Sequence, residues 1–400
     1  MAAWRQGEGD MSAASLKLIR LEHARLAALM RGECANARSD ALTHALRGAL
    51  GAACFGDATC WPLLAEAAPD LPLAPGHMAR LVPAPGRTGE LSDVSDACFE
   101  VWHCDAADLA SGRLGPVHYR FSESAGIVFG SVSLFEEPAG SSVQGATPLE
   151  RATYLAYEAI FRMLDALGIR HLLRIWNVVP AINAEQFGSE RYRQFNTGRQ
   201  RAFMACGRPV VDSVPAASAL GAPVSIEGDA PPSMPLAVSF LATRSPSDAI
   251  ENPRQVSAYR YPREYGPSAP TFARAAAWRG ACRPGTAPAL FVSGTASIVG
   301  HETVHRGDAM AQLRETLANI DAVLAQAAQG NLGNATLADL AYKIYVRDPD
   351  DADTLAAIDE VLCARCGFPP RVLYLHADIC RADLLLEIEA STGHGVEVLA

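Results

Sequence analysis

The feature that most constrains the fold of this chain is a helix–strand pair that occurs twice. Apolar residues at helical spacing run through residues 148–167 and again through 308–324. Each stretch is followed by a strand-like segment, at 171–179 and at 337–347. The two segments have a similar order of residue types, Leu-Leu-Arg-Ile-Trp in the first and Ala-Tyr-Lys-Ile-Tyr in the second. We therefore predict an α+β fold with two related units, each packing helices on one face of a mixed β-sheet. A coincidence between two ordinary helix–strand pairs is the alternative.

The N-terminal part of the chain has a different pattern. Apolar spacing predicts a helix over 12–32, and the Ala-rich stretch 40–53 is also predicted to be helical. Residues 61–90 are rich in Pro, Ala and Gly, which is typical of a linker. We expect three parts, namely a helical N-terminal extension with its linker (1–90), an N-terminal unit (91–235) and a C-terminal unit (236–400).

Size and charge restrict the function classes. A chain of 400 residues with 49% apolar residues can bury a large core in two or three structural units. Its net charge of −10 disfavours general binding to nucleic acid or to an anionic membrane. Of the 34 basic residues only Lys17 and Lys343 are lysines. The chain is therefore rich in the planar guanidinium groups that bind carboxylates through two hydrogen bonds.

The cysteines favour a reducing compartment. Ten cysteines are scattered along the chain, and the first residues lack the apolar segment of a signal peptide. No stretch approaches the about 18 apolar residues of a membrane helix. We expect free thiols and a cytoplasmic protein. The pair Cys363-x-x-Cys366 stands alone, so structural thiols are favoured there over a redox or metal role.

One motif points to zinc. Residues 301–305, His-Glu-Thr-Val-His, match H-E-x-x-H, which binds zinc when a helix projects both histidines from one face. Here Thr295–Gly300 indicates a strand and a turn, and the next helix begins near Asp308. We therefore expect a solvated loop and neither a metal nor a cofactor.

Two stretches dense in arginine and tyrosine suggest anion binding. They span residues 190–201 and 257–274. Arginine offers a fork of donors and tyrosine a hydroxyl, which together suit a carboxylate. Surface arginine in an arginine-rich protein is the alternative interpretation. The sequence shows neither a phosphate-binding loop nor a nucleophile elbow.

These segments resemble known families. Residues 290–390 are similar to the RidA/YjgF-like fold, through Phe-Val-Ser-Gly at 291–294, Tyr-Val-Arg-Asp-Pro-Asp-Asp at 345–351 and Leu-Leu-Glu-Ile-Glu at 385–389. Residues 95–390 resemble the chorismatases, which are built from such units and cleave chorismate. That resemblance rests on five segments in order, namely Leu-Arg-Ile-Trp-Asn (173–177), Glu-Arg-Tyr-Arg-Gln with Gly-Arg (190–199), Gln-Val-Ser-Ala-Tyr-Arg-Tyr-Pro (255–262), Phe-Ala-Arg (272–274) and Val-Ser-Gly-Thr-Ala-Ser-Ile-Val-Gly-His-Glu (292–302).

The resemblance implies a catalytic carboxyl and two clamps. The Glu of Gly-His-Glu, Glu302, would be the acid that protonates the enol ether of chorismate, with a pKa raised by burial. Tyr192 with Arg199 and Tyr261 with Arg274 would each bind one carboxylate of this dianion. The implied products are pyruvate and a hydroxybenzoate, the 3- or the 4-isomer or both.

Other activities stay open at this point. Hydrolysis of chorismate would give pyruvate and a dihydroxycyclohexadiene carboxylate. RidA-like proteins also suggest imine deamination, with an arginine near Arg371, and a binding protein without turnover is a further possibility. RidA-like units commonly form trimers, so we expect either a trimer-like homo-oligomer or a monomer whose own units replace that packing.

Overall fold

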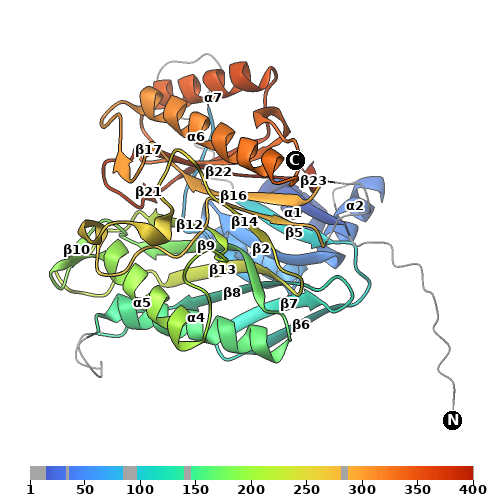
Figure 1. Ribbon diagram of the computed structural model, residues 1–400. Coiled ribbons are helices and arrows are strands. Elements are labelled where there is room, and N and C mark those ends of the chain that lie inside the picture. Colours follow the sequence, from blue (N-terminus) through green and yellow to red (C-terminus); the bar gives the residue numbers. More distant parts are fainter. Residues whose placement is uncertain (1–14, 33–35, 84–96, 139–145, 281–286, 400) are drawn as a thin grey trace, which may run out of the picture.

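The computed structural model describes residues 15–32, 36–83, 97–138, 146–280 and 287–399, and among these residues the strands form three large sheets and two short hairpins. Helices cover the outer face of each large sheet, and the inner faces of the sheets turn towards one another (Figure 1). The predicted α+β class, with mixed sheets and helices on one face, is confirmed.

The middle sheet contains seven strands and carries two helices. Its strand order is β21 (Asp378–Ile379), β12 (Ala216–Ala222), β9 (His171–Pro180), β13 (Leu236–Thr243), β8 (Ile127–Leu134), β7 (Val117–Ser122) and β6 (Leu109–Leu114). The helices are α4 (Pro148–Ala166) and α5 (Arg191–Ala205). Helix α4 begins at Pro148, as predicted, and the structure adds a capping box between Thr147 and Glu150.

The C-terminal sheet has the same build. Its order is β14 (Asp248–Ile250), β15 (Ala275–Trp278), β16 (Ala289–Thr295), β22 (Leu386–Thr392), β19 (Ala341–Val346), β20 (Val372–His376) and β4 (Arg80–Leu81). Helices α6 (Ala309–Gln329) and α7 (Ala352–Cys366) cover it on the side away from the middle sheet (Figure 1). Asp308 caps α6, as predicted, by accepting a hydrogen bond from the backbone N–H of Ala311.

Strand pairing supports the predicted duplication. After α4, strand β9 pairs in parallel with β12 and antiparallel with β13. After α6, strand β19 pairs in parallel with β20 and antiparallel with β22. The two helix–strand pairs thus occupy equivalent places in two sheets, which is not expected of a coincidence.

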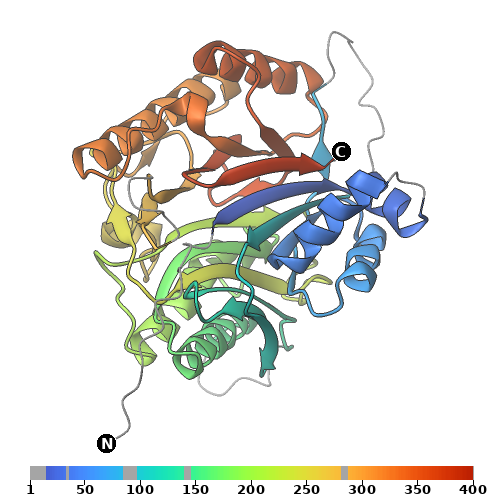
Figure 2. The same cartoon turned by 90° about the vertical axis from the view of Figure 1, so that its right-hand side faces the viewer.

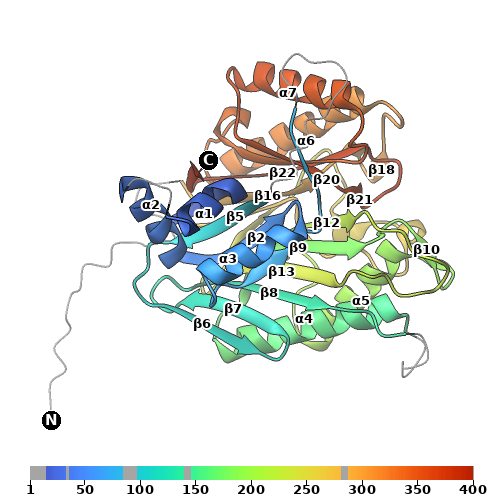
Figure 3. The same cartoon turned by 180° about the vertical axis from the view of Figure 1, so that it is seen from behind.

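The N-terminal sheet is the smallest of the three. Its order is β23 (Gly395–Leu399), β1 (Leu16–Glu22), β5 (Cys98–Cys104), β2 (Ala49–Phe55) and β3 (Leu73–Pro75). Helices α1 (His23–Met30), α2 (Asn36–Arg47) and α3 (Trp61–Ala67) lie on its outer side (Figure 3). Its edge strand β23 comes from the other end of the chain, so the red C-terminal strand runs beside a blue one (Figure 2).

Two predicted helices are partly wrong. Residues 16–22 form β1 because they pair on one side with β5 and on the other with β23. Residues 49–53 belong to β2, where Gly51 allows the Phe129 ring to approach so closely that a Cβ would lie 2.0 Å from it. In both cases partners distant in sequence override the local helical pattern. The N-terminal extension is therefore helical only in part.

Strand pairing also crosses both expected domain boundaries. Strand β13 follows residue 235 but pairs with β8 and β9 of the middle sheet, whereas β5 follows residue 90 and pairs within the N-terminal sheet. Strand β4 precedes residue 90 and pairs with β20 of the C-terminal sheet. These pairings join segments far apart in the sequence, which local composition does not reveal.

A buried chain of alternating charges connects the three sheets. Arg20 of the N-terminal sheet lies 3.1 Å from Glu100, measured from Nε to Oε1. The Nζ of Lys343 lies 2.5 Å from Glu100 Oε2 and 2.8 Å from Glu389 Oε1 in the C-terminal sheet. Glu389 Oε2 in turn lies 2.6 Å from an Nη of Arg174 in the middle sheet. Each buried charge therefore has an opposite partner, as burial in a low-dielectric interior requires.

Two sequence predictions concern the surroundings of the protein. The cysteines in the described part of the chain are free thiols, as predicted, while Cys34 and Cys282 lie outside the described residues. Among the described helices, none combines the length and the apolar character that crossing a membrane requires.

Candidate active site

Three of the four residues predicted to bind an anion meet in a small cavity between the middle and C-terminal sheets. The cavity has a volume of about 70 Å³, and segments far apart in the chain line it. The N-terminal part of α5 contributes Tyr192, and the segment after β14 contributes Tyr261, Tyr265 and Arg274. The remaining polar and charged lining residues are Glu190, Arg193, Cys380, Arg381 and Glu387.

Glu387 is the buried acid of this cavity. It lies on β22 and is 3% exposed. Burial raises the pKa of Glu387 to about 8, with a further contribution from the neighbouring Glu389, and the positive charges of Arg174 and Arg274 only partly oppose this. A carboxyl with such a pKa holds a proton at neutral pH and can donate it.

The immediate neighbours of Glu387 fix the position of its carboxyl. The thiol of Cys380 donates a hydrogen bond to Oε2 over 4.0 Å. On the other side Gly294 faces Oε1, and a Cβ at this position would lie only 1.9 Å from that oxygen. Gly294 therefore leaves the space that the carboxyl fills.

Two arginines supply positive charge to the same cavity. Arg274 donates to the Tyr261 hydroxyl over 2.9 Å and to the Val256 carbonyl over 2.8 Å, and its Nε has no partner among the protein atoms. Arg381 donates to the His301 carbonyl over 2.8 Å, while its second Nη lacks a protein partner. Buried N–H groups without a partner are rare, so both guanidiniums retain donors for a ligand.

Aromatic rings hold these guanidiniums in place. The Arg381 guanidinium lies 4.4 Å from the Tyr265 ring centroid and 5.3 Å from that of Tyr261. Arg274 lies 5.3 Å from the Phe272 ring centroid. Such cation–π contacts restrict the arginines without using their hydrogen-bond donors.

Three of the five residues chosen from the sequence come together here. Tyr192, Tyr261 and Arg274 line the cavity. Arg199 does not line it. It is buried in α5, where it donates to Asn196 over 2.7 Å and lies 4.9 Å from the Phe195 ring centroid. The arginines that line the cavity are Arg193, Arg274 and Arg381.

The predicted burial of Glu302 is wrong. Glu302 belongs to a short hairpin of β17 (Ile298–Val299) and β18 (Glu302–Thr303), and its side chain is exposed. Residues 301–305 are therefore not helical, as expected. His301 lies 3.2 Å from the Tyr265 hydroxyl and His305 lies 3.4 Å from Glu315, so the two histidines do not face a common point.

Sequence reasoning missed Glu387 although a signal was present. The segment 384–390 is apolar apart from Glu387 and Glu389, which place two acids on one face of a predicted strand. Acids on the buried face of a strand need partners or a function. Tyr265 lies in the arginine- and tyrosine-dense stretch 257–274, whereas Arg381 and Cys380 gave no comparable signal.

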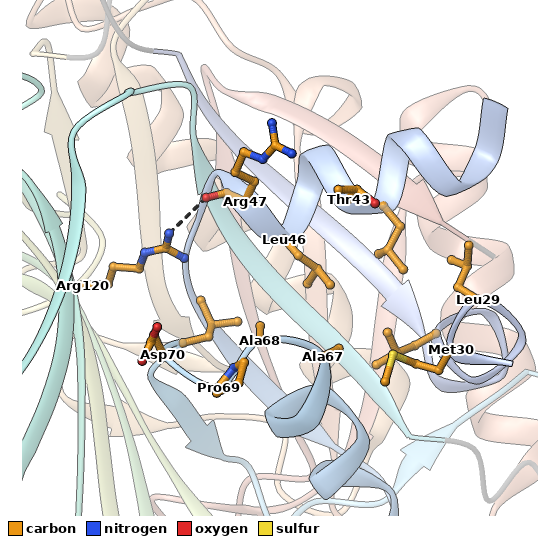
Figure 4. Close-up of a pocket in the computed structure, with 13 residues that line it drawn as sticks. Leu29, Met30, Thr43, Leu46, Arg47, Ala67, Ala68, Pro69, Asp70 and Arg120 are labelled. Atoms are coloured by element: carbon orange, nitrogen blue, oxygen red, sulfur yellow. Dashed lines mark hydrogen bonds between the residues drawn. The ribbon is translucent and has the colours of Figure 1, made fainter. Parts of the chain in front are cut away.

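A larger cavity elsewhere lacks this chemistry. It has a volume of about 420 Å³ and lies between α1, α2 and α3 at the N-terminal sheet (Figure 4). Its walls are mainly leucine and alanine, and at one end Arg120 donates to the Arg47 carbonyl over 3.1 Å. Asp70 is its acidic lining residue. Of these two cavities this one has the greater volume, whereas the buried acid and the arginines lie in the smaller one.

The smaller cavity thus defines a class of protein, an enzyme that combines a protonated carboxyl with guanidiniums for an anionic ligand. Comparison with known proteins agrees. A family model described as "Chorismatase FkbO/Hyg5-like, N-terminal" matches residues 100–242. A 3-hydroxybenzoate synthase of Streptomyces hygroscopicus is 41% identical over 246 residues, which are 60% of this chain and 68% of the relative.

Two further relatives lead to the same family. A chorismatase of Streptomyces rapamycinicus is 40% identical over 245 residues, covering 59% of this chain and 68% of its own length. A crystal structure of a chorismatase at 30% identity covers 86% of this chain and 93% of its own, with a TM-score of 0.65. The chain belongs to the chorismatase family.

Proposed function

We propose that this protein cleaves the enolpyruvyl ether of chorismate and releases pyruvate and a hydroxybenzoate. The observation that carries this proposal is the buried Glu387 carboxyl, whose pKa of about 8 keeps it protonated in a cavity that arginines also line. The substrate is a dianion that must be protonated on carbon, so it requires this combination of acid and cations. The 3-hydroxybenzoate synthase among the relatives favours the 3-isomer as product.

In the proposed reaction Glu387 transfers its proton to the terminal methylene carbon of the enol ether. The ether oxygen then carries positive charge, which weakens its bond to the ring. That bond breaks with departure of pyruvate. Loss of the proton on the hydroxyl-bearing ring carbon then gives the 4-isomer. For the 3-isomer, the hydroxyl oxygen must form a bond to the neighbouring carbon that pyruvate leaves and break its bond to its original carbon, after which the carbon that now bears the oxygen loses its proton. In both cases the ring releases one proton on becoming aromatic, and the Glu387 carboxylate recovers a proton. All atoms of chorismate appear in the two products, so no water is consumed.

Arg274 and Arg381 are the proposed carboxylate ligands. Both line the cavity, and each has a guanidinium nitrogen without a protein partner. Tyr261 and Tyr192 add hydroxyls on the same walls. Glu190 also lines the cavity, and burial raises its pKa, but its Oε2 lies 3.6 Å from Arg193 Nε, whose positive charge opposes that shift.

A single chain is proposed to hold a complete site. The lining residues come from both the middle and the C-terminal parts of the same chain, and the third sheet is also its own. Three sheets that face one another within one chain can replace the packing that separate subunits would provide. This supports the monomer among the two oligomeric states considered from the sequence.

The test is incubation of the purified protein with chorismate, with pyruvate measured by a coupled assay and the ring product by chromatography. We expect equal amounts of pyruvate and a hydroxybenzoate. Pyruvate with a non-aromatic dihydroxy acid would identify the hydrolytic reaction instead. Release of ammonia from an imino acid, without pyruvate from chorismate, would overturn the proposal in favour of imine deamination.

A further inference from the structure

Two histidines and an aspartate meet at the N-terminal sheet, away from the candidate active site. His103 lies on β5, Asp105 follows that strand, and His44 lies near the end of α2. Across the part of the chain that the structure describes, they form the one group of three or more such residues whose ligand atoms all lie within 4.8 Å of one another. Neither β5 nor α2 contributes a residue to the catalytic cavity.

The distances are too long for hydrogen bonds and suit an ion. The Oδ1 of Asp105 lies 3.5 Å from His103 Nδ1 and 3.7 Å from His44 Nε2. Hydrogen bonds of this kind span about 2.7–3.2 Å. A tetrahedral zinc ion with bonds of about 2.0–2.1 Å separates its ligand atoms by roughly 3.4 Å, so three such atoms can surround one ion after small movements.

His103 gives an independent indication of a missing partner. Its side chain is 1% exposed, and neither ring nitrogen makes a hydrogen bond of good geometry within the protein, although the backbone of His44 lies close to the ring. Buried polar atoms nearly always have one. The Nε2 edge packs against Gly48, where a Cβ would come within 2.1 Å of Nε2. Nδ1 therefore points the other way, towards Asp105.

The carboxylate of Asp105 is already oriented for such a role. The Ser15 hydroxyl donates to Oδ2, and the Lys17 ammonium lies 3.6 Å from the same oxygen. These contacts occupy Oδ2 and leave Oδ1 facing the two imidazoles. Outer partners that hold a ligating carboxylate in this way are usual at metal sites.

We infer that His44 Nε2, His103 Nδ1 and Asp105 Oδ1 form a binding site for one Zn²⁺ ion. Two imidazole nitrogens and a carboxylate oxygen are ligands that zinc prefers, and three protein ligands leave a fourth position for water. The Lys17 charge opposes the ion but sits on the far oxygen of Asp105. This inference does not depend on the proposed function.

Zinc at this place would attach α2 to the N-terminal sheet. On either side of His44 along α2, Thr43, Leu46 and Arg47 line the larger cavity (Figure 4). An ion that joins His44 to β5 would therefore hold one wall of that cavity in place. We expect zinc to slow hydrogen exchange in residues 42–47, a readout that does not involve catalysis.

The experiment measures zinc binding to the chelator-treated full chain by competition with a chromophoric chelator. We expect one tight zinc per chain, and more than about 10-fold weaker binding for both His44→Ala and Asp105→Asn, since even outer partners of metal ligands contribute 10–100-fold. The His44 side chain is 68% exposed, so its loss leaves the core intact. Zinc should slow exchange in residues 42–47 of the wild type but not of His44→Ala.

The matched control is His305→Ala, which removes an exposed histidine of the H-E-x-x-H segment. It should bind zinc as the wild type does. Loss of the tight site in His305→Ala, with binding retained in His44→Ala, would overturn the inference and place zinc at residues 301–305. Equal zinc affinity in the wild type and both ligand variants, or no tight binding at all, would also overturn it.

Discussion

Glu387 and Glu389 lie two residues apart on the same face of β22, and both are buried, but their surroundings shift their proton affinities in opposite directions. Burial acts on both carboxyls and raises the pKa of each. At Glu389 the charges of Lys343 and Arg174 outweigh burial and hold the pKa well below its ordinary value. At Glu387 the charges of Arg174 and Arg274 only partly oppose burial, so burial prevails.

This difference shows how one strand serves both structure and chemistry. The Glu389 carboxylate accepts hydrogen bonds from Ser218 over 2.6 Å, from Trp176 over 2.9 Å and from Tyr345 over 3.0 Å. Both of its oxygens therefore have hydrogen-bond donors. The region around Glu387 provides the Cys380 thiol and an adjoining cavity. The hydrogen bonds and cations around Glu389 keep it as a fixed carboxylate. The cavity beside Glu387 leaves room for a ligand that could accept its proton.

Glu387→Gln should have the largest effect, because it removes the transferable proton but keeps the shape of the side chain. We expect turnover of chorismate to fall by about 10²- to 10⁴-fold with little change in thermal stability. Pyruvate release and a melting curve measure the two quantities. Glu302→Gln distinguishes the two carboxyls: if it abolished turnover and Glu387→Gln did not, the assignment made from sequence would be restored.

Lys343→Met tests the other region, since it leaves Glu100 and Glu389 buried without their shared cation. We expect the free energy of unfolding to fall by about 3–5 kcal/mol, measured by denaturant titration. The matched control is Arg365→Met, which breaks a half-exposed pair with Asp321 and should cost about 0–1 kcal/mol. Equal losses in the two variants would show that the buried network does not stabilise the fold as described.

Arg274→Ala should act mainly on substrate binding, because the guanidinium is proposed to hold a carboxylate. Loss of a hydrogen bond to a charged group costs about 1.5–3 kcal/mol, so KM should rise by roughly 10- to 100-fold. Steady-state kinetics measure this, and Arg263→Ala, on an exposed arginine nearby, should leave KM unchanged. An unaltered KM in Arg274→Ala would remove Arg274 from the site.

The pH profile gives the smallest but most specific effect. Since Glu387 must be protonated to donate, kcat/KM should fall tenfold per unit as the pH rises above about 8. The folded protein holds this proton more tightly than the unfolded chain, in which the carboxyl has its ordinary pKa of 4.5. Protonation of Glu387 therefore contributes to the free energy of unfolding. This contribution is full below about pH 4.5 and is lost as the pH rises through about 8.

A variant sharpens this prediction. The positive charge of Arg274 lowers the pKa of Glu387, so Arg274→Ala should move the fall in rate to higher pH. A fall in kcat/KM centred near pH 4 to 5 in the wild type would instead indicate an ordinary, solvated carboxyl.

Much of the fold could be predicted because its signals are local. Helices α4 and α6 begin at a proline and a capping aspartate read directly from the sequence, and their apolar stripes give their length. Strand β9 lies where the sequence pattern predicted it. Strands β1 and β2 were mistaken for helix because their partners lie at positions 98–104 and 395–399, which local patterns do not encode.

The candidate site, like the fold, could be predicted only where the signal was local in the sequence. Tyrosine and arginine clusters identified Tyr192, Tyr261 and Arg274, because residue type alone indicates affinity for carboxylates. Arg199 was misplaced, because its position on α5 turns it towards Asn196 and Phe195 instead of the cavity. Glu302 was chosen as an acid that burial would keep protonated, but it is exposed, because burial depends on tertiary packing.

The amino-acid sequence by itself determined the repeated helix–strand units, the arginine and tyrosine groups and membership of the chorismatase family, since each resides in residues close together along the chain. Only the tertiary structure decided which carboxyl keeps its proton. A pKa depends on the solvent and charges around a group, and at Glu387 these are set by strands and loops from distant parts of the chain.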